Sequence, residues 1–293
     1  LECVTENHPE LLLHQWLRWR FGADLGDDEA LLRRLEGVYP FEQQRFIATG
    51  TAALILLSLG EAELAIEDFR RASALDADDV RVHRQLGLAF ARAHLALGAA
   101  EAFGRVVAVE PEDPGAWKQL GSSYLVLQRW QSAIDAFDEA VELGGDDVGV
   151  LLAQGYAYER LANFDEAHKR YRQSARLAPS AYQPQYRMGR AFLAQHELGR
   201  AEKALRKASE LDPSAAEPLG FLGELYLKKN DLEGAIESLE KSVALDAEYF
   251  EAYYRLAQAY RRAGREADAR TAIEEYQRLK ESERGASRNQ NKR

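Results

Sequence analysis

Two short stretches of the chain, WKQLGSSY at residues 117–124 and AIDAF at residues 133–137, carry the pattern that decides the fold. An alanine recurs at one constant interval on both sides of Ala133, without an insertion or deletion, at Ala65, Ala99, Ala167, Ala201, Ala235 and Ala269. The interval is thirty-four positions, and a fixed period of this length indicates a repeat protein, in which one structural unit is copied along the chain. We therefore divide residues 46–283 into seven consecutive units of this length.

Each unit has the spacing of two packed helices. Twelve residues before each repeated alanine lies Gly or Ala, such as Gly121, and three residues later a large apolar residue, such as Tyr124. Four residues after the alanine comes another large residue, such as Phe137. Separations of three and four place side chains on one helix face, and a small residue lets two helices approach closely. Turn formers at the unit boundaries, as in LDADD at residues 75–79, end one helix and start the next.

The third unit resembles the signature of the tetratricopeptide repeat family, Trp-x-x-Leu-Gly-x-x-Tyr, then Ala-x-x-x-Phe, then Pro. Gly145 takes the place of the Pro, and the other signature residues are Trp117, Leu120, Gly121, Tyr124, Ala133 and Phe137. The resemblance weakens in the terminal units, where Thr49 and Ala52 replace Trp and Leu, and Tyr276 replaces a small residue. It implies an all-α, right-handed superhelical solenoid of seven repeats, at residues 46–79, 80–113, 114–147, 148–181, 182–215, 216–249 and 250–283.

The two flanking segments depart from the period. Residues 1–45 are predicted to form an N-terminal helical cap, or a degenerate repeat, that covers the open apolar end of the array. The apolar residues near its start, which include Trp16 and Trp19, would cover more of a helix surface than the single stripe that packs against a core. Residues 1–22 are therefore also a candidate surface for homo-oligomer formation or for a partner. Residues 284–293 lack apolar periodicity and are predicted to form a flexible basic tail.

The composition excludes several classes of protein. With 46% apolar residues the chain can bury a continuous core, while a single cysteine excludes a disulfide-stapled fold. No stretch has the ~20 consecutive apolar residues of a bilayer-spanning helix, so we expect no membrane insertion. The formal charge of −10 disfavours nucleic acid as a partner, because nucleic acid is a polyanion. We expect a cytoplasmic location, although the chain begins with Leu1 and the sequence is compatible with an excised export signal.

The resemblance also implies which side chains face a ligand. In this family the first helix of each unit lines a concave groove, and the second, fifth, sixth, ninth, twelfth and thirteenth positions face it. These positions hold eleven basic and four acidic residues here, a local charge of +7 in a chain of −10. Because salt screens charges beyond ~8 Å, the local sign governs a ligand in the groove. The candidate peptide-binding residues are Arg81, Arg84, Arg92, Lys118, Gln119, Tyr156, Arg160, Tyr186, Arg187, Arg190, Phe221, Lys228, Tyr254, Arg255, Arg261 and Arg262.

Two interpretations of this wall are open. Arginine-rich positions interleaved with aromatic residues favour forked contacts to acidic groups of an extended peptide, with the rings as apolar platforms. Alternatively, the arginines only keep a helix face solvated. Two specialised modes of the family are not indicated. Ser122 and Ala153 replace both asparagines of a carboxylate clamp, and the sixth positions of the units hold no ladder of asparagines.

The sequence contains no constellation typical of catalysis or of a cofactor. It has no glycine-rich phosphate loop, no His-Glu-x-x-His, no paired cysteines and no nucleophile elbow. His94 and His196 occupy the same place in two units, but three units separate them and no further ligands accompany them, so we predict no metal site. We therefore expect a non-catalytic scaffold or adaptor that binds an extended, acidic peptide segment of a protein partner. The alternative is a partner-recruiting segment of a larger enzyme or of a secretion or assembly machine.

Overall fold

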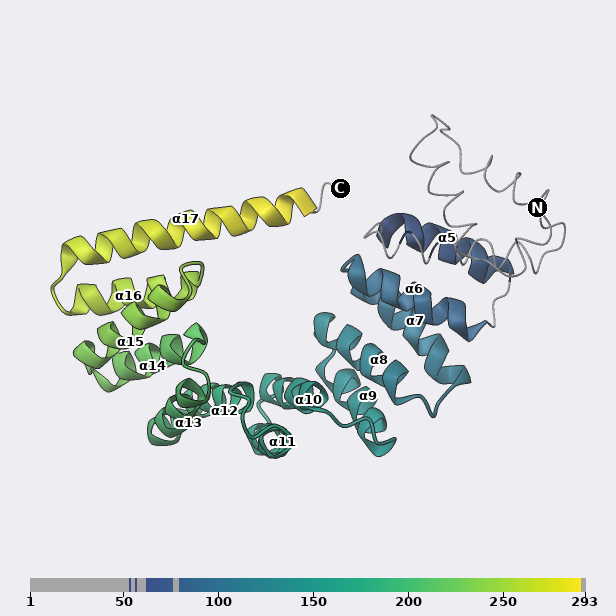
Figure 1. Ribbon diagram of the computed structural model, residues 1–293, viewed down its shortest axis with the longest axis horizontal. Helices are drawn as coiled ribbons and strands as arrows, with labels where there is room; N and C mark the ends of the chain where they lie inside the picture. Colours follow the sequence, from purple (N-terminus) through teal and green to yellow (C-terminus); the bar gives the residue numbers. More distant parts are fainter. Residues whose placement is uncertain (1–52, 54–55, 57–61, 76–78, 291–293) are drawn as a thin grey trace. The chain divides into compact units, whose positions relative to one another are not determined.

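A computed structural model of the chain describes residues 53, 56, 62–75 and 79–290, and all regular structure within them is α-helical (Figure 1). None of the helices that it describes is both long and apolar enough to span a lipid bilayer. The described helices are α5 (Ala62–Leu75), α6 (Val80–Arg92), α7 (Ala96–Val109), α8 (Pro114–Val126), α9 (Trp130–Glu142), α10 (Val148–Arg160), α11 (Phe164–Leu177), α12 (Gln183–Ala194), α13 (Leu198–Leu211), α14 (Ala216–Lys229), α15 (Leu232–Leu245), α16 (Phe250–Arg262) and α17 (Glu266–Gln290). The predicted all-α class is confirmed.

The helices repeat as pairs, in which an even-numbered first helix packs against the odd-numbered second helix that follows it. Helices α6, α8 and α10 begin at Val80, Pro114 and Val148, so their starts are separated by the same period as the repeated alanines. Those alanines, from Ala65 to Ala269, are at most 1% exposed. The first helix of the first predicted repeat, the cap at residues 1–45 and the candidate surface at residues 1–22 lie outside the continuously described segments. The count of seven repeats and the handedness therefore stay predictions.

A small residue at the eighth position of the repeat allows the two helices of a pair to pack closely. At Gly121 an added Cβ atom would lie 2.7 Å from the ring of Phe137, and at Gly155 it would lie 2.3 Å from the ring of Tyr171. A Cβ atom added at Gly87, Gly189 or Gly223 would likewise collide with the side chain of the residue sixteen positions later. The ring or leucine of the second helix thus fills the space that a side chain on the first helix would need.

The chain divides into two compact units, residues 1–145 and 146–293. In the first unit, α5 to α9 contribute to a core that contains Phe69 and Phe103. In the second unit, α10 to α17 contribute to one core cluster around Tyr171 and to another that contains Leu225. The consecutive first helices α10, α12, α14 and α16 also contact one another. They therefore form a layer of their own, which we call the first-helix layer.

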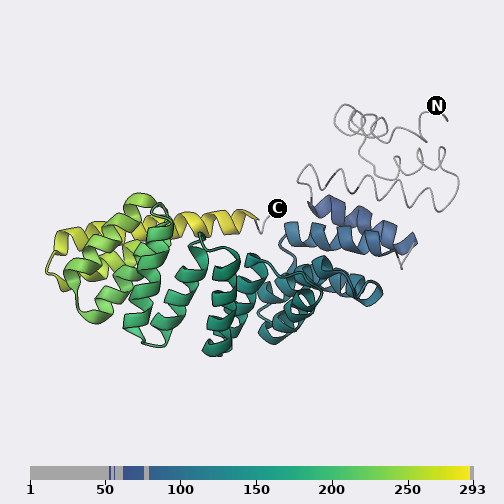
Figure 2. The same ribbon diagram turned by 60° about the horizontal axis from the view of Figure 1, so that its bottom comes forward.

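Helix α17 is longer than its predecessors and extends well past α16 in both views (Figure 1, Figure 2). It continues to Gln290, so residues 284–290 are helical, whereas we predicted a flexible tail over 284–293. Local pairs stabilise the turns of α17 that precede residue 284, and the helix continues from them. Arg278 Nη2 lies 2.7 Å from Glu275 Oε2, and Lys280 Nζ donates to Tyr276 Oη at 2.5 Å. Pairs three or four residues apart stabilise a helix that has no apolar period.

Candidate functional site

The first-helix layer of the second unit contains many of the side chains that the sequence predicts to bind a ligand. Six of them alternate between ring and guanidinium across α10, α12, α14 and α16, and we call this set the arginine–aromatic ladder. In order, the ladder consists of Tyr156, Arg187, Tyr186, Arg190, Phe221 and Arg255. Each guanidinium carbon lies between 4.7 and 5.8 Å from the centroid of the neighbouring ring. These distances are within the range of cation–π attraction.

Helical spacing brings the ladder residues to one face. On α12, Arg190 follows Tyr186 by four residues and Arg187 by three, so all three lie on neighbouring parts of the helix surface. The rings of Tyr186 and Phe221 meet edge to face, with centroids 5.6 Å apart, which joins α12 to α14. All six side chains of the ladder are partly exposed. A ligand on this layer can therefore contact both the rings and the guanidinium groups.

Two glutamates of the same layer neutralise two of the three ladder arginines. Arg190 Nη2 lies 3.9 Å from Glu159 Oε1, and Glu159 also accepts a 2.9 Å hydrogen bond from the hydroxyl of Tyr171. Arg255 Nη2 lies 2.9 Å from Glu224 Oε2, and Arg255 Nε donates to the same oxygen at 3.0 Å. The sequence identifies both glutamates as wall residues but does not show these pairs. The sum of +7 already counts both glutamates, so the pairs leave the net charge of the wall unchanged and show which arginines have an acid beside them.

Tyr186 of the ladder and the nearby Tyr249 are neutral at physiological pH. Burial raises the pKa of Tyr186, although the charges of Arg190 and Arg187 oppose the shift. Burial also raises the pKa of Tyr249 to about 12. The ring of Tyr249 lies only 2.6 Å from where a Cβ atom on Gly220 would be, so the glycine lets Tyr249 pack against α14. The layer thus presents uncharged rings between fixed positive charges.

In the first unit, acids at helix ends engage two of the predicted binding residues. Arg84 Nη2 lies 2.5 Å from Glu110 Oε2, and Arg84 Nη1 also pairs with Asp113, the N-cap residue of α8. Arg81 Nη2 lies 2.5 Å from Asp79 Oδ2, the N-cap residue of α6. The hydrogen bond from Arg81 lowers the pKa of Asp79. Arg81 therefore stabilises the start of its own helix, and Arg84 stabilises the junction between α7 and α8.

The remaining predicted residues lie outside the ladder. Arg262 donates to the carbonyl of Leu227 at 2.9 Å and to Asn230 Oδ1 at 2.6 Å, at the C-terminal end of α14, where a cation is favourable. Lys228 Nζ lies 3.9 Å from Glu224 Oε1. The first unit contains Arg92, Lys118 and Gln119, and exposed positions of the second unit contain Arg160, Tyr254 and Arg261.

Tyr182 extends the aromatic row of α12, and the sequence analysis missed it. Its ring centroid lies 6.4 Å from that of Tyr186, and its hydroxyl lies 3.5 Å from both carboxylate oxygens of Glu217. Tyr182 occupies the first position of its repeat, which is not one of the positions expected to face a ligand. The four-residue spacing from Tyr182 to Tyr186 is the signal that could have indicated a shared face.

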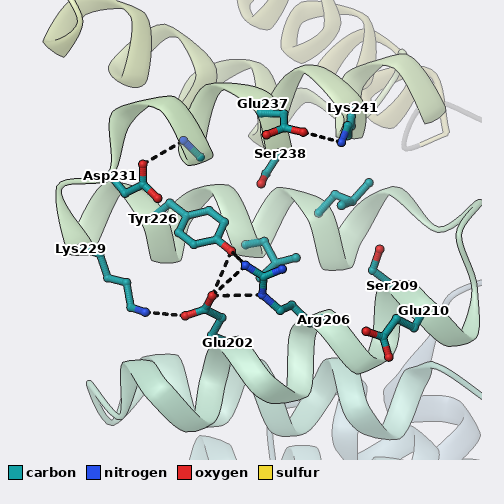
Figure 3. A pocket seen from close by; sticks show the side chains of 13 residues that line it. Glu202, Arg206, Ser209, Glu210, Tyr226, Lys229, Asp231, Glu237, Ser238 and Lys241 are labelled. Carbon is teal, nitrogen blue, oxygen red and sulfur yellow. Dashed lines mark hydrogen bonds and ion pairs between the residues drawn. The ribbon is translucent and has the colours of Figure 1, made fainter.

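A separate cavity of about 550 Å³ lies between α13 and α15, over α14 (Figure 3). At one end, Glu202 Oε1 accepts hydrogen bonds from Arg206 Nε at 3.0 Å and from Tyr226 Oη at 3.1 Å, and Glu202 Oε2 pairs with Lys229 (Figure 3). The hydrogen bond from Lys229 lowers the pKa of Glu202. These charged groups satisfy one another and join α13 to α14. We therefore assign them to stability rather than to ligand binding.

Comparisons with known proteins agree on the type of repeat. A family model described as TPR repeat matches residues 53–94 and 223–264. Three models described as tetratricopeptide repeat match residues 97–148 and 152–216, residues 192–241, and residues 251–282. A comparison with curated proteins finds no match.

Several solved structures share the fold at low sequence identity. A tetratricopeptide repeat protein from Parabacteroides merdae is 16% identical, with a TM-score of 0.59 over 86% of this chain and 98% of that chain. Yeast Tom70 is 19% identical, with a TM-score of 0.59 over 85% of this chain and 54% of that chain. YrrB, described as a TPR protein with an unusual peptide-binding site, is 18% identical, with a TM-score of 0.50 over 63% of this chain and 95% of that chain. At these identities the similarity shows the fold alone.

Proposed function

Because the chain belongs to the tetratricopeptide repeat family, we propose that it is a non-catalytic protein-interaction scaffold that binds an extended, acidic peptide segment of its partner. The family and its fold support the general role of a protein-binding scaffold. The nature of the ligand and the residues that bind it are our proposal.

The observation that supports this proposal is the arginine–aromatic ladder. It runs across four consecutive first helices of the second unit, and its side chains are partly exposed. Neutral rings offer apolar area at a low cost in side-chain entropy, and guanidinium groups between them favour acidic groups. An extended peptide that crosses successive helices would meet a ring and a cation at each step. We limit the proposed site to the second unit, because the rings and guanidinium groups that support it lie there.

Reversal of the ladder charges tests the proposal. Peptides are first selected from a random display library on the immobilised full chain, and then synthesised with a fluorescent label. The triple variant Arg187→Glu, Arg190→Glu and Arg255→Glu is expected to weaken their binding about tenfold or more, because acids of the peptide would then face acids of the wall. Binding to the unaltered chain is expected to weaken as salt rises, since counterions screen exposed charges.

A matched control changes the charge by the same amount elsewhere in the second unit. Arg176→Glu, Lys203→Glu and Lys207→Glu alter exposed residues of the second helices α11 and α13. This control triple is expected to bind the peptides as the unaltered chain does. Circular dichroism and urea unfolding check that both triples are folded. Equal binding by the ladder triple and the control triple would remove the ladder from the binding site.

A further inference from the structure

Arg187 differs from the other two arginines of the ladder in the groups that surround it. Its guanidinium carbon lies 5.6 Å from the ring centroid of Tyr156 and 5.8 Å from that of Tyr186. Its side chain forms no hydrogen bond or ion pair with any residue in the described ranges, whereas Arg190 and Arg255 each face a glutamate. Arg187 therefore contacts rings but shares its charge with no acid of the described residues.

This environment prepares Arg187 for a carboxylate. Neither ring accepts a hydrogen bond from Arg187, so the N–H groups of its planar guanidinium are available to hydrogen-bond a ligand. A carboxylate can accept two parallel bonds from that edge, and such bidentate pairs are stronger than bonds between neutral groups. The ring contacts also restrict the long side chain, so less rotamer freedom is lost when the pair forms.

We propose that Arg187 binds one carboxylate of the ligand, and that Arg190 and Arg255 are positioning residues that fix the rings beside it. This inference rests on the proposed function and narrows its ligand. Arg190 lies 5.8 Å from the centroid of Tyr186 and 5.2 Å from that of Phe221, while Glu159 offsets its charge. The carboxylate can come from an Asp or Glu side chain or from the C-terminus of the partner.

The positions of the two glutamates argue for a single carboxylate. Glu159 lies beside Arg190, and Glu224 lies beside Arg255, so a second or third acid of the ligand would approach a negative charge of the protein. Apolar or aromatic side chains are better suited to the exposed ring surfaces on either side of Arg187. Within the acidic segment, the part that lies on the ladder is therefore one carboxylate flanked by apolar groups, rather than a run of acids.

A double-mutant cycle on the full chain tests this assignment. The selected peptides are synthesised in four forms, with Glu or Gln at the enriched acidic position and with a free or amidated C-terminus. Their dissociation constants are measured by fluorescence polarisation with the unaltered chain, Arg187→Leu and Arg187→Lys. If Arg187 binds the carboxylate, Arg187→Leu weakens the binding of the carboxylate form about tenfold to a hundredfold but barely changes the form that lacks it. Arg187→Lys recovers only part of the loss, because an ammonium group cannot make the forked pair.

Arg176→Leu is the matched control for charge. Arg176 lies on the second helix α11 of the second unit, outside the candidate binding positions, is exposed, and has no polar partner or ring contact among the described residues. Its loss is expected to change binding less than about twofold. If the Gln form loses the coupling to Arg187, the carboxylate comes from an acidic side chain of the peptide. If the amidated form loses it, the carboxylate is the C-terminus of the peptide.

Two results would overturn the assignment. One is a set of selected peptides without a shared carboxylate, and the other is an equal effect of Arg187→Leu on all four peptide forms. Separate variants test the proposed function itself. Tyr186→Ala and Phe221→Ala should weaken every ladder-bound peptide, whatever its charge, because apolar contact area is lost. If these variants weaken binding while Arg187 shows no coupling to a carboxylate, the scaffold site stands and only the role of Arg187 is wrong.

Discussion

At the residue scale, the turn between the two helices of a repeat depends on one left-handed residue. The fifteenth position of successive repeats has a positive φ, although most of its occupants are not glycine: His94, Gln128, Ala162, His196, Asn230 and Gly264. At Ala162 φ is 57°, and the following N–H, that of Asn163, donates to the carbonyl of Tyr158 at 2.9 Å. This arrangement closes the C-terminal end of a helix. A side chain with a Cβ atom is strained there, and glycine is not.

Ala162→Gly is therefore expected to stabilise the protein. Relief of the left-handed strain favours the variant by ~1–2 kcal/mol, and the greater freedom of glycine in the unfolded chain offsets part of this, which leaves a net gain of roughly 0.5–1 kcal/mol. The urea midpoint, followed by circular dichroism, measures the change. Gly264→Ala at the equivalent place, where φ is 75°, should shift the midpoint in the opposite direction. Shifts of the same sign in both variants would contradict the explanation by strain.

At the scale of the helix pair, the fold depends on the contact between a glycine of the first helix and a large residue of the second. Gly121 in α8 is such a residue, because a Cβ atom there would lie 2.7 Å from the ring of Phe137, which is 1% exposed. The ring cannot move into solvent without leaving the core. In contrast, Gly104 in α7 has nothing within 4 Å of its missing Cβ atom.

The two glycines should respond in opposite ways to the same substitution. Gly121→Ala is expected to lower the free energy of unfolding by ~1–3 kcal/mol, because the added methyl group overpacks the helix contact. Gly104→Ala should raise it by ~0.5–1 kcal/mol, because alanine is the better helix former and meets no obstacle. Hydrogen exchange of α6 to α9 is the measurement of choice, since repeats unfold locally. Destabilisation of similar size in both variants would show that the close contact is not the cause.

The sequence predicts these helix pairs well because their determinants are local and recur. The separation of twelve residues from Gly121 to Ala133, which recurs in every unit, specifies both helices and their contact face. The same period predicted where the ladder side chains lie, since Tyr156 and Arg187 are at matching faces of neighbouring first helices. The sequence did not predict Tyr182 as part of the aromatic row. Tyr182 belongs to the row only because its ring lies beside that of Tyr186. The repeat positions that face a ligand are considered one at a time, so they do not show such a contact.

At the scale of the whole molecule, charged pairs between adjacent repeats are the feature that the sequence could not predict. Arg190 pairs with Glu159 and Arg255 pairs with Glu224, and both pairs join the first helices of neighbouring repeats. The period brings such positions near one another, but long side chains have many rotamers and several acids within reach. A sum of charges over wall positions cannot tell a free arginine from a paired one. The structure thus leaves Arg187 as the ladder arginine without an acid among the described residues, a distinction that composition does not contain.

A buried titratable side chain, His168 of α11, also contributes to the contact between adjacent repeats. Its ring stacks on Phe192 of α12 with centroids 3.9 Å apart, and its Nε2 lies 2.9 Å from the amide nitrogen of Gln195. His168 is 6% exposed, and burial, aided by the charge of Arg172, lowers its pKa from 6.5, although Glu197 opposes the shift. The neutral ring accepts the hydrogen bond from Gln195, whereas a protonated ring would present N–H to N–H.

The stability of the second unit should therefore fall in mild acid. Because the pKa of His168 is lower in the folded chain than in the unfolded chain, the unfolded chain binds the proton first. The contribution of neutral His168 is complete above ~pH 7.5 and is lost as the pH falls through ~6.5 toward the lower folded pKa. Hydrogen exchange of α11 to α13, measured at steps from ~pH 7.5 to ~pH 5 and corrected for the intrinsic exchange rate, should show this loss.

Two variants separate His168 from the other groups that titrate in this range. His168→Leu should flatten the pH dependence of exchange in α11 to α13, since leucine binds no proton. His196→Asn removes a histidine from the turn after α12 but keeps a residue that tolerates a left-handed backbone, as Asn230 does at the equivalent place. This control should retain the slope of the unaltered chain. If His168→Leu keeps that slope, or if the pH dependence is the same across all helices from α10 to α17, net charge rather than His168 governs the acid response.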